Sequence, residues 1–285
     1  MKINTLCIIG VGLIGGSLAR ALRKAGACGD IVGCSRQQRN LERALALGVI
    51  DRFDTDVAKA ISGADMIVVT APLSAMEPLF HAMAGKIAPD TVLTDGGSAK
   101  QSVLAAARAA FGEIPKNLVP AHPIAGTEQS GVDASFDTLF QGHRVVMTPV
   151  AETDPVAISR VRAMWEAAGA IVAEMDARHH DRVLGATSHL PHVLAYALVD
   201  MLGEMDQKTE IFRYAAGGFR DFTRIASSDP RMWHDICFAN TDAIVAMLER
   251  FQERLQSVTN GIRNEEKEFI KALFARAKHY RDRNT

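Results

Sequence analysis

Residues 6–17 of the chain read LCIIGVGLIGGS, a short apolar run followed by a glycine-rich turn and the start of a longer amphipathic stretch. Gly10, Gly12 and Gly15 are spaced as in the pattern G-x-G-x-x-G. In that pattern the first glycine allows a tight turn, the second lets the backbone approach a pyrophosphate, and the third allows close packing of helix on strand. The first N–H groups of the helix then face the phosphates. The stretch therefore predicts a strand, a turn and a helix that bind a dinucleotide.

The alternation of short β-branched runs with amphipathic stretches continues to about residue 175. The expected strands are Leu6–Ile9, Ile31–Gly33, Met66–Thr70, Thr91–Thr94, Leu118–Val119, Val145–Thr148 and Ile171–Ala173. The expected helices between them span residues 17–24, 37–47, 100–111 and 155–168. This order predicts an α/β domain over residues 1–175, with one parallel, doubly wound sheet covered by helices on both faces.

Residues 176–285 carry helical patterns without a strand signal, which predicts a second, all-helical domain. Residues 176–205 are expected to form one long helix disturbed by Pro191, and Gly217 with Gly218 to mark a loop. Helical pattern resumes near Pro230. An apolar seam then alternates steps of four and three through Ile244, Leu248, Phe251, Leu255, Val258 and Ile262. Such a seam suits helix-against-helix packing, either within one chain or, as we expect, in a homodimer formed through the C-terminal helices.

Charge and cysteine content exclude several classes of protein. The 32 basic and 33 acidic residues give a net charge of −1, whereas a protein that binds nucleic acid or an anionic membrane normally has a basic excess. The four cysteines form no C-x-x-C pair, which favours free thiols in a reducing cytoplasm. Residues 3–19 lack charge and superficially resemble a signal peptide, but their glycines would break an apolar helix. We expect a cytoplasmic protein without a membrane span.

The residues after the second expected strand bear on the choice of cofactor. NAD-binding proteins usually carry an acidic residue there for the ribose hydroxyls, but this chain has Ser35 and Arg36, with Arg39 one turn further on. A guanidinium suits a 2′-phosphate, so we expect NADP, with NAD as a possibility. The alternative is that both arginines are solvated surface cations. The other expected cofactor contacts are Leu13, Ile14, Thr70 and Pro72.

Three further clusters combine residues that can carry chemistry. They are residues 95–100 (DGGSAK), residues 120–128 (PAHPIAGTE), and residues 188–192 (SHLPH) together with 217–224 (GGFRDFTR). The first two follow expected strands and so lie at the sheet edge where doubly wound folds bind ligands. Taken singly, the clusters are compatible with a capping serine, a packed histidine and a surface arginine. Their joint order behind the glycine turn favours a catalytic site.

With these motifs the chain resembles the prephenate/arogenate dehydrogenase family, the cyclohexadienyl dehydrogenases of tyrosine biosynthesis. The resemblance extends over nearly the whole chain and is most specific at residues 122–126, 188–192 and 218–224. It implies a Rossmann-type domain followed by a helical substrate and dimerisation domain. It also implies oxidative decarboxylation of prephenate or arogenate, with hydride transfer to NAD(P)+. Residues 34–38 resemble the NADP-using branch.

Site residues follow from the motifs and the resemblance together. We expect His122 to accept the hydroxyl proton, because an imidazole with a pKa of about 6.5 is largely neutral near pH 7. The resemblance places Ser98 beside the same hydroxyl and makes Arg224 the clamp for a substrate carboxylate, with Arg220 as the weaker choice. The remaining expected substrate contacts are Glu128, His189, His192 and Trp233, with Asp181 and Asp221 shaping the pocket. His189 and His192 lack a third ligand of suitable spacing, so no metal is expected.

Two other functions stay open at this point. One is a different dehydrogenase of similar architecture, of the β-hydroxyacid or pyrroline-carboxylate type, although those of the first type usually use a helical lysine for which no clear equivalent is present. The other is a non-catalytic NADP-binding redox sensor, which would not need Ser98, His122 and Arg224 together. The sequence does not decide between prephenate and arogenate.

Overall fold

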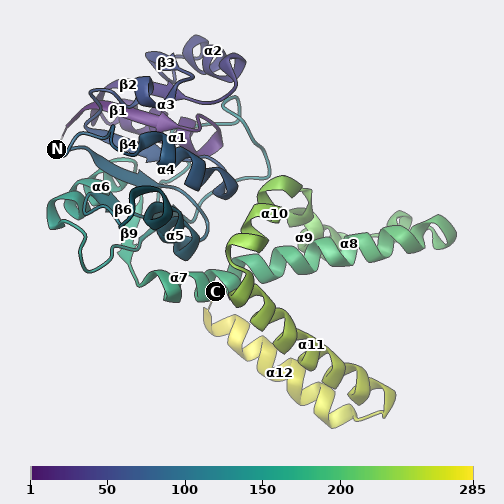
Figure 1. Cartoon of the computed structure of the whole chain (residues 1–285). Helices are drawn as coiled ribbons and strands as arrows, with labels where there is room; N and C mark the ends of the chain where they lie inside the picture. Colours follow the sequence, from purple (N-terminus) through teal and green to yellow (C-terminus); the bar gives the residue numbers. More distant parts are fainter. Residues whose placement is uncertain (1, 285) are drawn as a thin grey trace.

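The computed structural model describes residues 2–284, and the side chains of all of these except residues 206–209 and 284. A six-stranded parallel sheet, in the order β3-β2-β1-β4-β5-β6, forms the centre of the first half (Figure 1). Its strands are β1 (Ile3–Ile9), β2 (Cys28–Cys34), β3 (Arg52–Asp54), β4 (Met66–Val69), β5 (Val92–Asp95) and β6 (Leu118–Val119). The strand order reverses between β1 and β4, and this switch point opens a crevice at the carboxyl ends of the strands.

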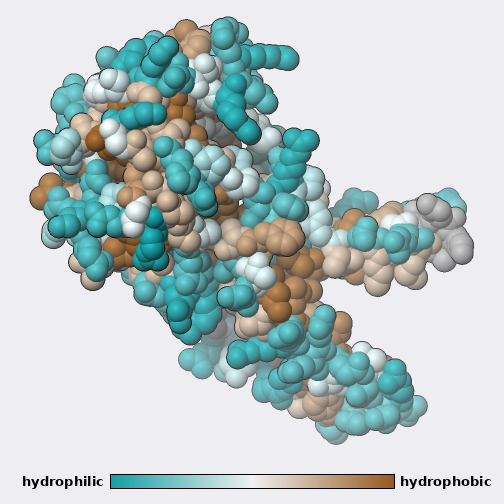
Figure 2. Space-filling view, in the orientation of Figure 1, coloured by the Kyte–Doolittle hydropathy of each residue, from teal (hydrophilic) through white to brown (hydrophobic). Residues whose placement is uncertain are grey.

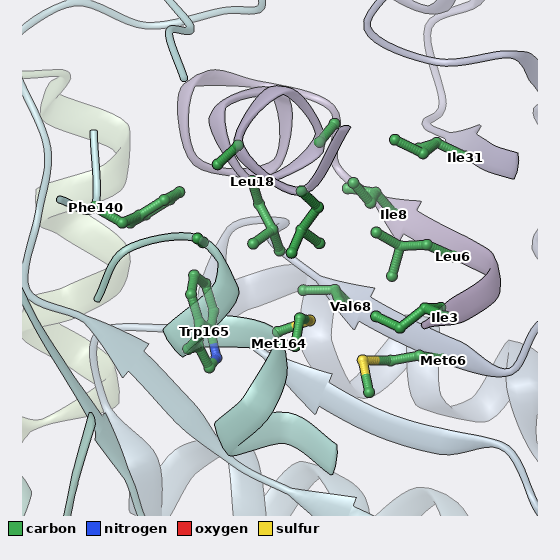
Figure 3. Close-up of a cluster of buried hydrophobic side chains, with 14 of the residues drawn as sticks. Ile3, Leu6, Ile8, Leu18, Ile31, Met66, Val68, Phe140, Met164 and Trp165 are labelled. Carbon is green, nitrogen blue, oxygen red and sulfur yellow. The ribbon is translucent and has the colours of Figure 1, made fainter. Parts of the chain in front are cut away.

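Two apolar layers cover the sheet, as expected for strands buried on both faces. The helices are α1 (Leu13–Lys24), α2 (Gln38–Ala46), α3 (Val57–Ala60), α4 (Met76–Met83), α5 (Lys100–Phe111) and α6 (Pro155–Ala167). Side chains of α1, α2 and α6 form one layer with alternate residues of the strands, and those of α3, α4 and α5 form the other. Figure 3 shows the first layer, in which Leu18 of α1 and Trp165 of α6 belong to the same apolar cluster as Ile8 and Val68.

A second, three-stranded sheet corrects the prediction of a single parallel sheet. It contains β7 (Ala121–Pro123), β8 (Arg144–Met147) and β9 (Ile171–Glu174), and β7 runs antiparallel to β8. A parallel pair needs a long crossover, usually a helix, and residues 124–143 contain no helix. By contrast, β8 and β9 are joined through α6 and are parallel. The strands predicted at residues 145–148 and 171–173 therefore exist but belong to this separate sheet.

The helical half agrees with its prediction at Pro191 and differs from it at Gly217 and Gly218. Its elements are α7 (Ala177–Leu184), the π-helical turn η2 (Gly185–His189), α8 (Leu190–Thr209), η3 (Ile211–Tyr214), α9 (Gly217–Thr223), η4 (Arg224–Ser227), α10 (Pro230–Ala239), α11 (Thr241–Arg263) and α12 (Lys267–Asn284). The long helix expected over residues 176–205 is disturbed near Pro191, as predicted, because η2 ends two residues before this proline, whose ring cannot donate a backbone hydrogen bond. Gly217 and Gly218 do not form a loop but begin α9, because packing against α8 outweighs their low helix propensity.

Two helical arms leave the body of the molecule in different directions. Figure 1 shows α8 as one arm and the antiparallel pair of α11 and α12 as the other. Hydrophobic side chains gather where the arms meet α10 (Figure 2). The apolar seam of α11 is only partly covered within the chain, since Ile244 is buried whereas Leu255 is 53% and Ile262 62% exposed.

Two smaller predictions can also be compared with the structure. Cys7, Cys28, Cys34 and Cys237 are all free thiols, as predicted. Among the described residues, no helix is both long enough and apolar enough to traverse a lipid bilayer.

Candidate active site

A cavity of about 380 Å³ lies where the first half of the chain meets the helical half. It is lined by the glycine turn before α1, the ends of β4 and β5, the loop after β7, η2 and α10. The expected site residues in its wall are Gly12, Leu13, Ile14, Thr70, Pro72, Ser98, His122, Glu128, His189 and Trp233. The fold thus brings together cofactor and substrate residues that lie as much as 221 positions apart, from Gly12 to Trp233.

The glycine turn has the shape that a dinucleotide requires. A Cβ atom on Gly10, whose φ is +98°, would lie 2.8 Å from backbone atoms of Thr70 and Ala71. A Cβ atom on Gly15 would lie 2.5 Å from the Thr70 hydroxyl, whereas one on Gly12 would meet no atom within 4 Å. Helix α1 also begins without a side-chain cap, which leaves its first N–H groups available for phosphate oxygens. These residues fit a dinucleotide cofactor.

The residues expected to determine the preference for NADP or NAD are Ser35, Arg36 and Arg39. They follow β2, beside the glycine turn, and do not line the cavity. The N–H of Gly10 donates to the carbonyl of Cys34 at 2.8 Å, so the segment after β2 starts next to the turn. The Ser35 hydroxyl accepts a hydrogen bond from the Gln37 N–H at 3.1 Å, and the Arg36 and Arg39 side chains are exposed. Both side chains are therefore open to solvent near the end of β2.

His122 is held in the cavity wall by β7 and is only 9% exposed. Its Nδ1 lies 2.9 Å from Nε2 of His180, and the two rings meet edge to face. Burial, followed by the effects of His180 and Lys100, lowers the pKa of His122 well below its usual value. The ring is therefore neutral at pH 7 and has one nitrogen left for a ligand. Ser98 lines the same cavity.

A buried ion pair that the sequence analysis missed fixes the backbone before His122. Nζ of Lys100 lies 2.5 Å from the carboxylate of Asp95 and donates to the carbonyl of Ala121 at 2.6 Å. The other carboxylate oxygen of Asp95 accepts from the Ala121 N–H at 3.2 Å. Both side chains are fully buried, so their mutual pairing is what makes the two charges tolerable there.

His180 was also missed, although its neighbour Asp181 was expected near the pocket. Asp181 accepts hydrogen bonds from the N–H groups of Lys100 at 2.7 Å and Gln101 at 2.9 Å, and so caps α5. It also lies 2.8 Å from Nδ1 of His180. Burial acts to raise the pKa of Asp181, but these hydrogen bonds outweigh it and hold the pKa below its usual value. The only sequence signal was the run of His179, His180 and Asp181 at the start of the helical half.

His189 and Trp233 present unsatisfied polar atoms at the cavity. His189 is 1% exposed, and its Nδ1 lies 3.1 Å from the side-chain nitrogen of Asn240. Among the described residues, neither Nε2 of His189 nor Nε1 of Trp233 has a hydrogen-bond partner. Burial lowers the pKa of His189 to about 4. Buried polar atoms of this kind are normally paired, so a ligand that accepts hydrogen bonds suits this part of the cavity.

Two of the remaining expected substrate residues do not line the cavity themselves but contact residues that do. His192 stacks on Trp233 with ring centroids 3.7 Å apart. Arg224, whose side chain is 64% exposed, forms an ion pair with Glu128 at the cavity wall. Arg220 and Asp221 are exposed on α9 and do not line the cavity. Among the described residues there is no cluster of three potential metal ligands.

Comparison with known proteins identifies the family. The model of the "Prephenate dehydrogenase, nucleotide-binding domain" matches residues 18–174, and that of the "Prephenate dehydrogenase, dimerization domain" matches residues 176–276. The chain belongs to the prephenate dehydrogenase family. The family expected from the motifs, and its architecture of a Rossmann-type domain followed by a helical dimerisation domain, are confirmed.

Relatives within the prephenate dehydrogenase family carry different substrate names. The cyclohexadienyl dehydrogenase of Zymomonas mobilis is 39% identical, over 93% of this chain and 90% of that protein. Prephenate dehydrogenase from A. aeolicus, solved with hydroxyphenyl propionate and NAD+, superposes with a TM-score of 0.93 at 35% identity, over 100% of this chain and 99% of that one. Synechocystis arogenate dehydrogenase gives a TM-score of 0.81 at 26% identity, over 99% and 100% of the two chains.

Proposed function

We propose that the chain catalyses the oxidative decarboxylation of prephenate, with arogenate as the alternative substrate, using a nicotinamide dinucleotide. The observation that carries this proposal is the neutral, buried His122, which has one ring nitrogen bound to His180 and shares its cavity with Ser98 and the glycine turn. Family membership supports the same reaction. It also favours this reaction over that of a β-hydroxyacid or pyrroline-carboxylate enzyme.

The reaction requires the protein to accept the proton of the substrate hydroxyl for a time and to keep ring carbon C4 next to the cofactor. Prephenate carries a hydroxyl on ring carbon C4 and a carboxylate on C1. The nicotinamide, when bound, accepts the hydride that leaves C4. The bond between C1 and its carboxylate then breaks, CO₂ departs, and the electron pair moves through the ring to the oxygen on C4. The sum contains no free proton, so the proton taken from the hydroxyl returns to the same oxygen as the ring becomes aromatic.

His122 is the residue that we propose holds this proton. A neutral imidazole accepts it and a protonated one cannot, so kcat should fall as the pH falls through the pKa of His122. Because burial lowers that pKa well below its usual value, activity should not depend on this group between pH 6.5 and 8. We propose that Ser98 contacts the same hydroxyl from the end of β5.

Arg224 is proposed to bind a carboxylate of the substrate. Its guanidinium can hold a carboxylate through two parallel hydrogen bonds, and its present partner is the carboxylate of Glu128. The unpaired ring nitrogens of His189 and Trp233 supply further donors, and His192 supports the indole ring on which it stacks. We propose that these residues surround the substrate on the side that faces the helical half.

The first test of the proposed function is turnover. Steady-state assays with prephenate and arogenate should show reduction of the cofactor and release of CO₂ with at least one of them, and none with 3-hydroxy acids. His122→Asn should lower kcat about 10²–10⁴-fold while the Kd of the cofactor stays unchanged, as expected when general-base help is lost. Normal turnover in His122→Asn would remove this residue from the mechanism. Cofactor binding without turnover of either substrate would favour the sensor alternative.

We propose NADP as the preferred cofactor over NAD, because Arg36 and Arg39 flank the end of β2 with exposed guanidinium groups. Arg36→Ala should lower kcat/KM for NADP about tenfold and change that for NAD less than twofold, since only NADP carries the 2′-phosphate. A clear preference of the unmodified chain for NAD would contradict this assignment.

We further propose that residues 1–175 form the cofactor domain and residues 176–285 the substrate and dimerisation domain. The ranges matched by the two family models support this division. We place the enzyme in the cytoplasm, a reducing compartment in which its four cysteines would stay free.

A further inference from the structure

A chain of hydrogen bonds leads from the cavity into the core behind it. Nδ1 of His122 is 2.9 Å from Nε2 of His180, and Nδ1 of His180 is 2.8 Å from Oδ1 of Asp181. Asp181 is in turn fixed by the first two N–H groups of α5. Both His180 and Asp181 are almost completely buried, at 0% and 1% exposed. Solvent therefore cannot replace His180 or Asp181 as a hydrogen-bond partner.

The carboxylate of Asp181 determines which ring nitrogens of His180 and His122 carry hydrogen. An ionised carboxylate can only accept hydrogen bonds, so Nδ1 of His180 must carry a hydrogen and donate it to Asp181. When this is the only hydrogen on the ring of His180, its Nε2 is an acceptor. Nδ1 of His122 then carries a hydrogen, and the lone pair of His122 lies on Nε2, the nitrogen left for the cavity.

We propose that His180 and Asp181 are positioning residues of this site, which hold His122 in the one tautomer that can accept a proton from the substrate. The proposal rests on the proposed function, because it assigns these residues to the same proton transfer. It extends to His122 the logic of catalytic triads, in which a buried carboxylate orients a histidine and stabilises its protonated form. Here a second histidine stands between the carboxylate and the base.

The arrangement also explains how a buried site tolerates the proton. When the substrate O–H bond breaks, its proton bonds to Nε2 of His122, and the positive charge spreads through the Nδ1–H···Nε2 bond toward His180 and the carboxylate of Asp181. The proton later returns from Nε2 to the same substrate oxygen. No proton has to reach solvent, which agrees with the complete burial of His180.

Other charged and titratable groups face His122 from each element packed around it. Lys100 of α5 lies close, pairs with Asp95 of β5, and acts to disfavour a positive charge on His122. His189 of η2 lines the cavity. Among the groups around His122, the carboxylate of Asp181 is the one that His180 connects to it by hydrogen bonds. Removal of His180 therefore disconnects His122 from this carboxylate.

Two substitutions of His180 separate positioning from mere packing. His180→Leu fills the space with an apolar side chain but removes the acceptor for Nδ1–H of His122. His180→Gln keeps an acceptor, its amide oxygen, but cannot share the positive charge. We expect kcat to fall about 10²-fold or more in His180→Leu and about tenfold in His180→Gln, with KM for prephenate and the Kd of the cofactor within twofold of the unmodified enzyme. His179→Gln, at the exposed neighbouring histidine, is the matched control and should keep its kcat.

Two results would overturn the proposal by kinetics. One is a kcat of His180→Leu within threefold of the unmodified enzyme. The other is an equal loss in the Leu and Gln variants that is accompanied by an equal fall in Tm, because this would show a purely structural role.

The tautomer of His122 can be measured without substrate turnover, so the positioning role can be tested independently of the proposed function. ¹⁵N NMR of histidine-labelled protein at pH 7 should show the proton of His122 on Nδ1 in the unmodified chain. His180→Gln should keep this tautomer, and His180→Leu, where it folds, should show a mixture. A proton on Nε2 of His122 in the unmodified chain would refute the positioning role even in an active enzyme. Failure to oxidise either substrate would instead refute the proposed function, while the NMR result would still decide the tautomer.

Discussion

At the scale of single residues, the site depends on buried histidines. His122, His180 and His189 are all buried, and for His122 and His189 burial is the main cause of a lowered pKa. A neutral imidazole can be donor and acceptor at once, which is what a site that moves a proton without releasing it needs. The side-chain nitrogen of Asn240 donates to the carbonyl of Asp181, so it also donates to Nδ1 of His189 and leaves that ring with Nε2–H as a donor.

Burial of neutral histidine links the stability of the protein to pH. The pKa of His189 is about 4 in the folded chain and about 6.5 when unfolded, so the unfolded chain binds more protons as the pH falls below 6.5. The contribution of His189 to stability is thus complete above pH 6.5 and declines toward pH 4. In His189→Gln, the loss of unfolding free energy between pH 7 and pH 5 should be smaller by about 2 kcal/mol, measured by urea unfolding. An unchanged pH dependence would show that His189 does not titrate in this way.

The sequence indicated the types of residue in the site better than their contacts. Ser98, His122, Glu128, His189 and Trp233 were expected and all line one cavity, because each stands in a motif directly after a strand or on a helix of the second half. The pairing of His122 with His180 was not predictable, since 58 residues separate them and neither carries a periodic pattern that points to the other. The same holds for Lys100 and Asp95, which resemble an ordinary helix start.

At the scale of elements, the junction of β1 and α1 is the part of the fold that the sequence determines most strictly. Its glycines are required for different reasons. Nearby protein atoms leave no room for a Cβ atom on Gly10 or Gly15, whereas a Cβ atom on Gly12 would point into open space. The helix that follows begins at Leu13, four residues earlier than expected, because the turn needs only the residues up to Gly12. We therefore expect Gly10 and Gly15 to be needed for folding and Gly12 to be needed for cofactor binding.

A pair of alanine substitutions tests this separation. Gly12→Ala should fold with a nearly unchanged Tm, because no atom lies within 4 Å of the new Cβ. Its methyl group occupies the approach of the pyrophosphate, so the Kd of the nicotinamide dinucleotide should rise at least about tenfold. Gly15→Ala should instead lower the unfolding free energy by about 1–3 kcal/mol, since its Cβ would overlap the Thr70 hydroxyl and the Gly10 carbonyl. Isothermal titration and urea unfolding measure the two effects, and the reverse pattern would contradict the assignment.

Element prediction was accurate where apolar residues form a clear pattern and failed where they do not or where topology decided. Helix α5 has the predicted bounds, residues 100–111, because its alanine-rich sequence begins and ends clearly. Strands β3 (RFD) and β7 (AHP) contain no β-branched run and were missed, whereas β6, only two residues long, was predicted from its apolar pair. The pairing of β8 with β7 depends on the missing crossover helix, which the expected strands alone do not reveal.

At the scale of the whole molecule, the cavity needs both halves of the chain. The first half supplies the glycine turn, Ser98 and His122, and the second supplies His180, His189 and Trp233. Hydrogen bonds of Asp181 to α5 and of Ser74 to Asp235 join the halves beside the cavity. The halves therefore cannot separate without disturbing the surroundings of His122, and the arms α8 and α11–α12 extend from the second half away from the body of the molecule (Figure 1).

The exposed seam of α11 leads to a prediction about assembly. Leu255 and Ile262 continue the apolar pattern that buries Ile244 but are more than half exposed in the single chain, and the helical half matches the dimerisation domain of the family. A carboxylate placed in an apolar interface loses the burial of the original side chain and adds a large desolvation penalty. The double substitution Leu255→Glu and Ile262→Glu should therefore change the mass measured by light scattering from about twice 30.8 kDa to that of one chain. Leu45→Glu, at an exposed leucine of α2, is the control and should leave the dimer intact. A double variant that keeps the dimeric mass would exclude this seam from the interface.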